Sequence, residues 1–159
     1  MDAKDSVEFK KSTNKLSIHT PGHGSYLPYL RSFVADLAHQ IGFPDEEIAQ
    51  IEMSVDEACS NVVKHAYAQH QEWVWQHRRP EIRLDVQTRD NQLIIEIHDH
   101  GQKFDFATYR ADDIRARIHD MKTNGYGIFI MRKFMDEVTY TSCDATGNTL
   151  RLVKYLKKT

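Results

Sequence analysis

Apolar and polar residues alternate with two different periods along the chain, and these periods separate strands from helices. Alternation around Leu16 and Ile18 predicts a short strand over residues 15–20. Apolar residues then recur every three or four positions, which predicts a helix over residues 27–41 and a second helix from Asp45 to about Tyr67. The first of these helices has Ser25 as its candidate N-terminal cap and ends at Gly42, and Asp45 is the candidate cap of the second.

The second half of the chain has mainly the period of strands. Two alternating runs, 82–86 and 93–97, flank Asp90 and Asn91, which predicts a β-hairpin. A helix is expected after Gly127, followed by a closing hairpin over residues 138–142 and 149–156 with its turn at Gly147 and Asn148. Residues 69–79 are polar and are interpreted as a loop or an irregular helical extension. Residues 102–124 are polar and weakly periodic, with a short helix considered over 113–121. The longer segment, about 102–124, has the length of a functional lid.

This element order predicts an α+β fold. We expect a two-layer α/β sandwich in which helices cover one face of a mixed, mostly antiparallel sheet. The 159 residues are too few for two ordinary domains, so residues 1–159 are interpreted as a single domain, and 40% apolar residues suffice for one sizeable core.

Composition excludes several classes of protein. Lysine plus arginine number 21 and aspartate plus glutamate 23, so the net charge of −2 gives no general reason to bind nucleic acid or an anionic membrane. The sequence contains no apolar run of the roughly 18 residues that a membrane span needs, and residues 1–14 are polar, unlike a signal peptide. Cys59 and Cys143 are the only cysteines, which excludes a disulfide framework and predicts a cytoplasmic protein.

Three separated segments carry candidate chemistry. In the first, Glu57 and Asn61 are four residues apart and share a helix face, which His65 continues. An acid and an amide beside a buried stripe could face a cleft, and the alternative is an ordinary solvated helix face. In the second, Asp99 ends an apolar strand and Gly101 follows it. Such a carboxylate could accept a hydrogen bond from an exocyclic amine such as that of adenine, although a strand followed by a turn is common.

The third segment contains Gly125 and Gly127 immediately before an apolar helix. Unpaired amides and the helix dipole at a helix N-terminus favour phosphate. The alternative is a helix entry that requires unusual backbone angles. Any one of the three segments is weak, and their order and spacing together carry the interpretation.

With these three segments in this order, the chain resembles the ATP-binding domain shared by histidine kinases, DNA gyrase, MutL and the heat-shock chaperone ATPases. Within that superfamily it is most similar to the bacterial anti-sigma-factor serine-protein kinases. The resemblance runs from about Tyr26 to Lys157 and is most specific over residues 127–138 and 147–154. It implies the histidine-kinase-like ATPase fold, with ATP and Mg²⁺ as cofactors.

The resemblance also implies a role for each matching residue. Glu57 matches the general base that accepts the proton of a serine hydroxyl, and Asn61 matches the residue that holds Mg²⁺ between the phosphates of ATP. Asp99 matches the carboxylate that reads adenine. The remaining matches are Gly101 beside that carboxylate, Gly125 and Gly127 at the phosphate end of the lid, and Thr149 near adenine.

One position departs from the family pattern, because Lys103 stands where a second glycine is common after Asp99 and Gly101. Lys103 could contact a phosphate or could crowd the loop. We predict a phosphate contact, since an ammonium in the first turn of the lid can reach the charge near Gly125 and Gly127.

The function implied by the resemblance is an ATP-dependent serine/threonine-protein kinase and anti-sigma factor. Such a protein phosphorylates an anti-sigma-factor antagonist and sequesters a sigma factor or similar target, and the subfamily commonly forms homodimers. The alternative is a nucleotide-binding interaction module without phosphotransfer, which Glu57 and Asn61 disfavour and Lys103 keeps open.

Three further features have open interpretations. The nine histidines form no recognised metal-binding signature, although His98 and His100 would point the same way from an extended strand. Trp73 and Trp75 either cover the end of the sheet or form a patch for a partner. Arg31 is either a solvated side chain or part of the first-helix region that meets protein partners in the resembling family.

Overall fold

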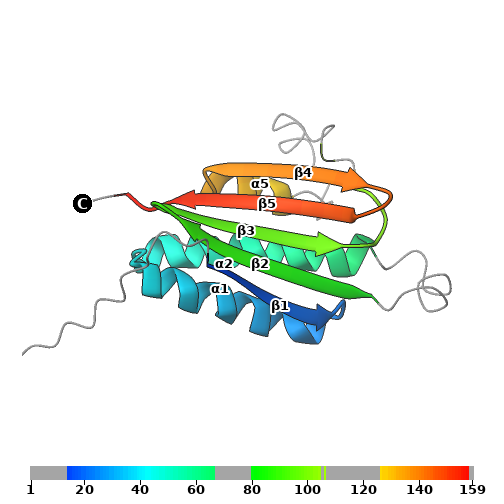
Figure 1. Cartoon of the computed structure of the whole chain (residues 1–159), viewed down its shortest axis with the longest axis horizontal. Helices are drawn as coiled ribbons and strands as arrows, with labels where there is room; N and C mark the ends of the chain where they lie inside the picture. The colour runs from blue at the N-terminus through cyan, green and yellow to red at the C-terminus, as the bar shows by residue number, and fades with distance from the viewer. Residues whose placement is uncertain (1–13, 67–79, 105, 107–125, 158–159) are drawn as a thin grey trace, which may run out of the picture.

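The computed structural model describes residues 14–66, 80–104, 106 and 126–157. Within these ranges it contains five strands and three α-helices (Figure 1). The strands are β1 (Lys15–Pro21), β2 (Glu81–Arg89), β3 (Gln92–Asp99), β4 (Glu137–Cys143) and β5 (Gly147–Tyr155). The helices are α1 (Leu27–Ile41), α2 (Asp45–Asn61) and α5 (Tyr126–Phe134), with a 3₁₀ turn at Gly24–Tyr26 and a π-helical turn at Val62–Ala66.

The five strands form one sheet in the order β1-β2-β3-β5-β4. Every neighbouring pair is antiparallel, so the prediction of a mixed sheet is wrong for the described strands. The three helices lie together behind the sheet in Figure 1, which confirms a two-layer α+β architecture with the described helices on one face. This arrangement places the end of β3 beside the start of β5, where two polar residues meet.

The hydrophobic core fills the space between the sheet and the helices. Alternate residues of β2, β3 and β5 face the helices, because successive side chains of a strand point to opposite faces. The largest fully buried members are Leu30, Val34, Ile51, Val55, Ile82, Leu84, Val86, Leu93, Ile95, Ile97, Met131 and Leu152. These are the residues whose 3.6- and 2-residue periods defined the helices and strands in the sequence.

Element boundaries differ from the predictions in three places. The side chain of His23, rather than Ser25, accepts a backbone N–H at the turn that leads into α1. Asp45 is the first residue of α2 rather than its cap, and the helical path continues through a π turn to Ala66. Gly147 and Asn148 belong to β5 rather than to the turn, which lies at residues 144–146.

We predict that Gly147→Ala destabilises the fold. Gly147 has a φ of 84°, and an added Cβ would lie 2.4 Å from the backbone oxygen of Asp99. Backbone strain of this kind costs about 1–3 kcal/mol before the collision is counted. Urea unfolding should show the loss, with Gly24→Ala as control because no atom lies within 4 Å of an added Cβ there. Equal stability of the two variants would contradict the assigned backbone.

Candidate functional site

Asp99 ends β3 on the face of the sheet that the helices cover, and it is buried. The backbone N–H of Gly101 donates to Asp99 Oδ1 over 2.8 Å, and the side-chain amide of Asn148 donates to the same oxygen over 2.8 Å. Both hydrogen bonds use Oδ1, and Asp99 lines a cavity between the sheet and the helices. The arrangement leaves Oδ2 as the oxygen for a ligand in that cavity.

Asn148 is the residue that positions Asp99. It is buried at the start of β5, directly opposite Asp99 in the antiparallel register. Its amide also donates to the carbonyl of Gly101 over 3.0 Å, and its own oxygen accepts from Ser142 Oγ over 2.7 Å. The amide therefore fixes both the rotation of the Asp99 carboxylate and the path of the chain that follows it.

Thr149 lies elsewhere than the resemblance implies. Strand alternation places it on the opposite face of the sheet from Asp99, where its hydroxyl shares a hydrogen bond of 2.9 Å with His98 Nδ1. Thr149 does not line the cavity, and Asn148 occupies the place beside the carboxylate. The sequence interpretation assigned Asn148 to a turn and took Thr149 from the resemblance. Because neighbouring residues of a strand face opposite sides of the sheet, only Asn148 of the two lies beside Asp99.

Burial raises the pKa of Asp99, while the hydrogen bonds from Asn148 and Gly101 oppose the rise. A carboxylate at this depth is costly to keep ionised without a partner. Both donors from the described residues reach Oδ1, so an amine of a ligand could serve as the donor to Oδ2.

Aromatic side chains border the cavity. Phe106 stacks on Tyr140 of β4 with ring centroids 5.9 Å apart, and the guanidinium of Arg132 lies 4.8 Å from the centre of the Phe106 ring. Tyr140 Oη accepts the backbone N–H of Phe104 over 3.0 Å, which ties the chain after Asp99 to β4. Apolar and aromatic walls around one buried carboxylate suit a flat heterocyclic ring with an amino group. The lining residues are Ala58, Asn61, Val62, Asp99, Gln102, Lys103, Phe104, Phe106, Ile128, Met131, Tyr140 and Leu150.

Glu57 and Asn61 of α2 lie against Gly127, which belongs to the glycine-containing segment at the start of α5. The buried Gly127 lies in the first turn of α5 and packs against α2. A Cβ on Gly127 would lie 2.8 Å from Glu57 Oε2 and 3.1 Å from Asn61 Nδ2. The missing side chain of Gly127 therefore makes room for both groups, and Asn61 also lines the cavity that contains Asp99.

We predict that Gly127→Ala leaves adenosine binding largely intact but weakens binding of ATP. The methyl group would displace the flexible end of Glu57 and the amide of Asn61 without reaching Asp99. Titration calorimetry with both ligands would show a larger loss for ATP, with Gly24→Ala as control. An equal loss for both ligands would indicate a general disturbance of the fold instead.

The other predicted residues are placed as follows. Gly101 follows β3 and donates to Asp99, as described above. Lys103 lines the cavity with an exposed side chain whose Nζ lies 3.6 Å from Asp144 Oδ1. Gly125, Trp73, Trp75 and most of the 102–124 segment lie outside the described residues. Arg31 of α1 pairs with Asp56 of α2 over 3.0 Å, so it links the two helices beside Glu57.

The residues present fit ATP with Mg²⁺. Asp99 offers an acceptor for an adenine amine, the amide oxygen of Asn61 is a ligand type that Mg²⁺ accepts, and Lys103 adds positive charge at the rim. The close approach at Gly127 brings the start of α5 to the same side chains.

Comparison with known proteins agrees with this geometry. Relatives named serine-protein kinase RsbW, from Bacillus cereus (strain AH820) and Bacillus thuringiensis (strain Al Hakam), are each 26% identical over 148 residues, covering 91% of this chain and 86% of the relative. A Mycobacterium tuberculosis structure of RsbU and RsbW domains aligns with a TM-score of 0.63 at 18% identity over 92% of this chain, which spans only 34% of that chain. The SiaB–SiaC complex from Pseudomonas aeruginosa aligns with a TM-score of 0.58 at 11% identity, covering 89% of this chain and 88% of that one.

Among the described residues, no helix is both long and apolar enough to cross a membrane. Residues 21–154, most of the chain, match the family described as histidine kinase-like ATPase domain. The match spans Asn61 and Asp99, which line the cavity, and Glu57 and Gly127, which lie beside Asn61. The chain therefore belongs to the histidine kinase-like ATPase domain family.

Proposed function

We propose that this protein is an ATP-dependent serine/threonine-protein kinase that phosphorylates an anti-sigma-factor antagonist and sequesters a sigma factor or a similar target. The observation that carries the proposal is the buried Asp99, whose Oδ1 is held by Asn148 and Gly101 while the residue lines the cavity that Asn61 also lines. The relatives named RsbW support the kinase assignment. The fold shared with SiaB, solved as a complex with SiaC, is in keeping with a protein partner.

Each residue has one role in this proposal. Asp99 accepts a hydrogen bond from the adenine amine, and Asn61 holds the Mg²⁺ that accompanies the phosphates. Glu57 is the general base that takes the proton of the substrate hydroxyl, and Gly127 keeps it beside Asn61. ATP supplies the transferable phosphoryl group, and catalysis of such transfers depends mainly on positioning and charge stabilisation.

The test is capture of binding proteins from the native cell with and without ATP, followed by mapping of phosphorylated residues on what is captured. The proposal predicts one small protein that gains phosphate on a serine or threonine only when ATP and the wild-type chain are both present. Capture without any phosphate transfer would favour the alternative, a nucleotide-binding interaction module. Lys103 supports that alternative, because it occupies a position where the family often has glycine.

We predict that Lys103→Gly weakens ATP more than adenosine. Lys103 lines the cavity, and its partner Asp144 is almost fully exposed, so the ammonium can turn to a phosphate. The attraction should weaken with salt. Calorimetry at two ionic strengths would measure it, with Lys64→Gln, an exposed lysine of the π turn, as control. Tighter ATP binding by Lys103→Gly would mean that the lysine obstructs the loop.

A further inference from the structure

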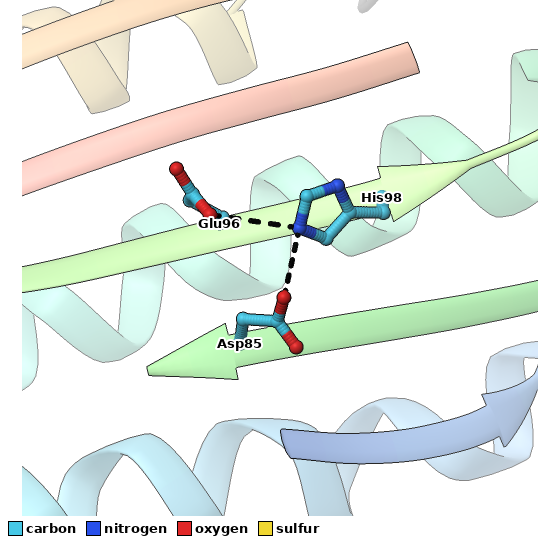
Figure 2. Close-up of side chains that lie close together, drawn as sticks. All are labelled: Asp85, Glu96 and His98. Atoms are coloured by element: carbon cyan, nitrogen blue, oxygen red, sulfur yellow. Dashed lines mark ion pairs between the residues drawn. The ribbon is translucent and has the colours of Figure 1, made fainter. Parts of the chain in front are cut away.

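Three side chains converge on the face of the sheet opposite the nucleotide cavity. Figure 2 shows Asp85 on β2 and Glu96 and His98 on β3, all pointing away from the helices. Asp85 and Glu96 are direct cross-strand partners, and His98 is two residues further along β3. Because His98 and Asp99 are consecutive in a strand, they face opposite sides of the sheet. The cluster is therefore independent of the proposed nucleotide site.

The distances within this cluster match those between the ligands of a metal ion. His98 Nε2 lies 3.1 Å from Asp85 Oδ2 and 3.7 Å from Glu96 Oε2, and the three ligand atoms lie within 4.8 Å of one another. Ligands bound tetrahedrally to Zn²⁺ at about 2.0–2.1 Å lie about 3.3 Å from each other. Imidazole nitrogen and carboxylate oxygen are both ordinary Zn²⁺ ligands.

Two of these atoms are buried and lack a hydrogen bond of good geometry within the described part of the chain. They are Asp85 Oδ2 and His98 Nε2, and the residue Asp85 is only 2% exposed. The two atoms lie 3.1 Å apart without forming a hydrogen bond, and Asp85 Oδ2 forms an ion pair with the ammonium of Lys15. A buried oxygen that already attracts a cation, beside a buried imidazole nitrogen without a hydrogen bond, is a candidate pair of metal ligands.

A hydrogen bond to the second ring nitrogen of His98 orients its imidazole toward the cluster. His98 Nδ1 shares a hydrogen bond with Thr149 Oγ1, which leaves Nε2 to face the two carboxylates, the usual outer-shell arrangement of a metal-binding histidine.

Positive side chains already pair with both carboxylates of the cluster. Lys15 Nζ lies 2.8 Å and Arg83 Nε 3.4 Å from Asp85 Oδ2, and Arg151 Nε lies 3.8 Å from the other oxygen of Glu96. Lys15 and Arg83 are about half exposed and can turn outward, whereas Asp85 cannot. A bound cation would replace Lys15 at Asp85.

We propose that Asp85, Glu96 and His98 form a Zn²⁺ site with one coordination position open to water. The test is titration of the metal-stripped, untagged full chain with ZnCl₂, and with CoCl₂ for its visible absorption. The wild type should bind one Zn²⁺ that His98→Gln and Glu96→Gln each weaken by about 10-fold or more, since even the loss of an outer-shell partner typically costs 10–100-fold.

Two further variants separate this site from nonspecific binding. His19→Gln removes an exposed histidine of β1 that pairs with Glu81, and it should leave Zn²⁺ affinity unchanged. Lys15→Met removes the competing ammonium and should tighten Zn²⁺ binding. Zn²⁺ affinity that is the same in the wild type, His98→Gln and Glu96→Gln would overturn the proposal, as would weaker binding by Lys15→Met.

Discussion

Replacing Glu57 by glutamine is expected to lower phosphoryl transfer by about 10²–10⁴-fold, the usual contribution of a positioned general base. Glutamine has the shape of glutamate, so the contact with Gly127 and the position of Asn61 should persist. ATP affinity should therefore change little. Transfer of labelled phosphate to the captured substrate protein, beside calorimetry of ATP binding, separates the two effects.

The matched control is Glu52→Gln, the same change of charge on the same helix and away from Gly127. It should transfer phosphate at the wild-type rate. Undiminished transfer by Glu57→Gln would remove Glu57 from the mechanism. A parallel loss of ATP affinity would instead assign it to binding.

Replacing Asp99 by asparagine is expected to weaken ATP by about 10–100-fold, the effect of leaving buried polar groups unpaired. The oxygen of asparagine can still accept from Gly101 and Asn148, so the local structure is kept. Its amino group would then replace Oδ2 and would face the adenine amine, donor against donor. Calorimetry with ATP measures the loss, and Asp90→Asn, in the exposed turn between β2 and β3, is the control.

The same variant should not lose stability at pH 7. Because burial raises the pKa of Asp99 in the folded protein, the folded state binds its proton more tightly than the unfolded state does. The contribution of Asp99 to stability is therefore greatest below the unfolded pKa of about 3.9 and declines as pH rises through the folded pKa. Asparagine avoids that decline, so its advantage over the wild type should shrink on acidification in urea unfolding. The stability difference between Asp99→Asn and the wild type should favour the variant more at pH 7 than at pH 4. The opposite order would contradict this assignment.

Periodicity alone was sufficient to predict the layers of the fold. Leu93, Ile95 and Ile97 alternate because one face of β3 is buried, and the same alternation correctly placed Asp99 at the end of a strand. Helical spacing likewise placed Glu57 and Asn61 on one face of α2, since neighbours four apart are a local property of a helix.

Periodicity could not predict the features that depend on strand register or on helix packing. Gly147 continues β5 with a positive φ, so the strand starts earlier than its apolar run, and Asn148 rather than Thr149 faces Asp99. The meeting of Gly127 with Glu57 depends on how α5 packs on α2, which no local pattern specifies. The cluster around His98 depends on cross-strand pairing in the same way.

The central claim, that the cavity beside Asp99 binds adenine nucleotide, is tested most directly by calorimetric titration of the wild-type chain with ATP and GTP in the presence of Mg²⁺. The amino group of adenine can donate to Asp99 Oδ2, whereas guanine has a carbonyl oxygen at that ring position and would face the carboxylate acceptor against acceptor. We expect one ATP to bind per chain, more tightly with Mg²⁺ than without it, and GTP to bind about 10-fold or more weakly than ATP. Equal affinity for the two nucleotides, or no binding of ATP, would contradict it.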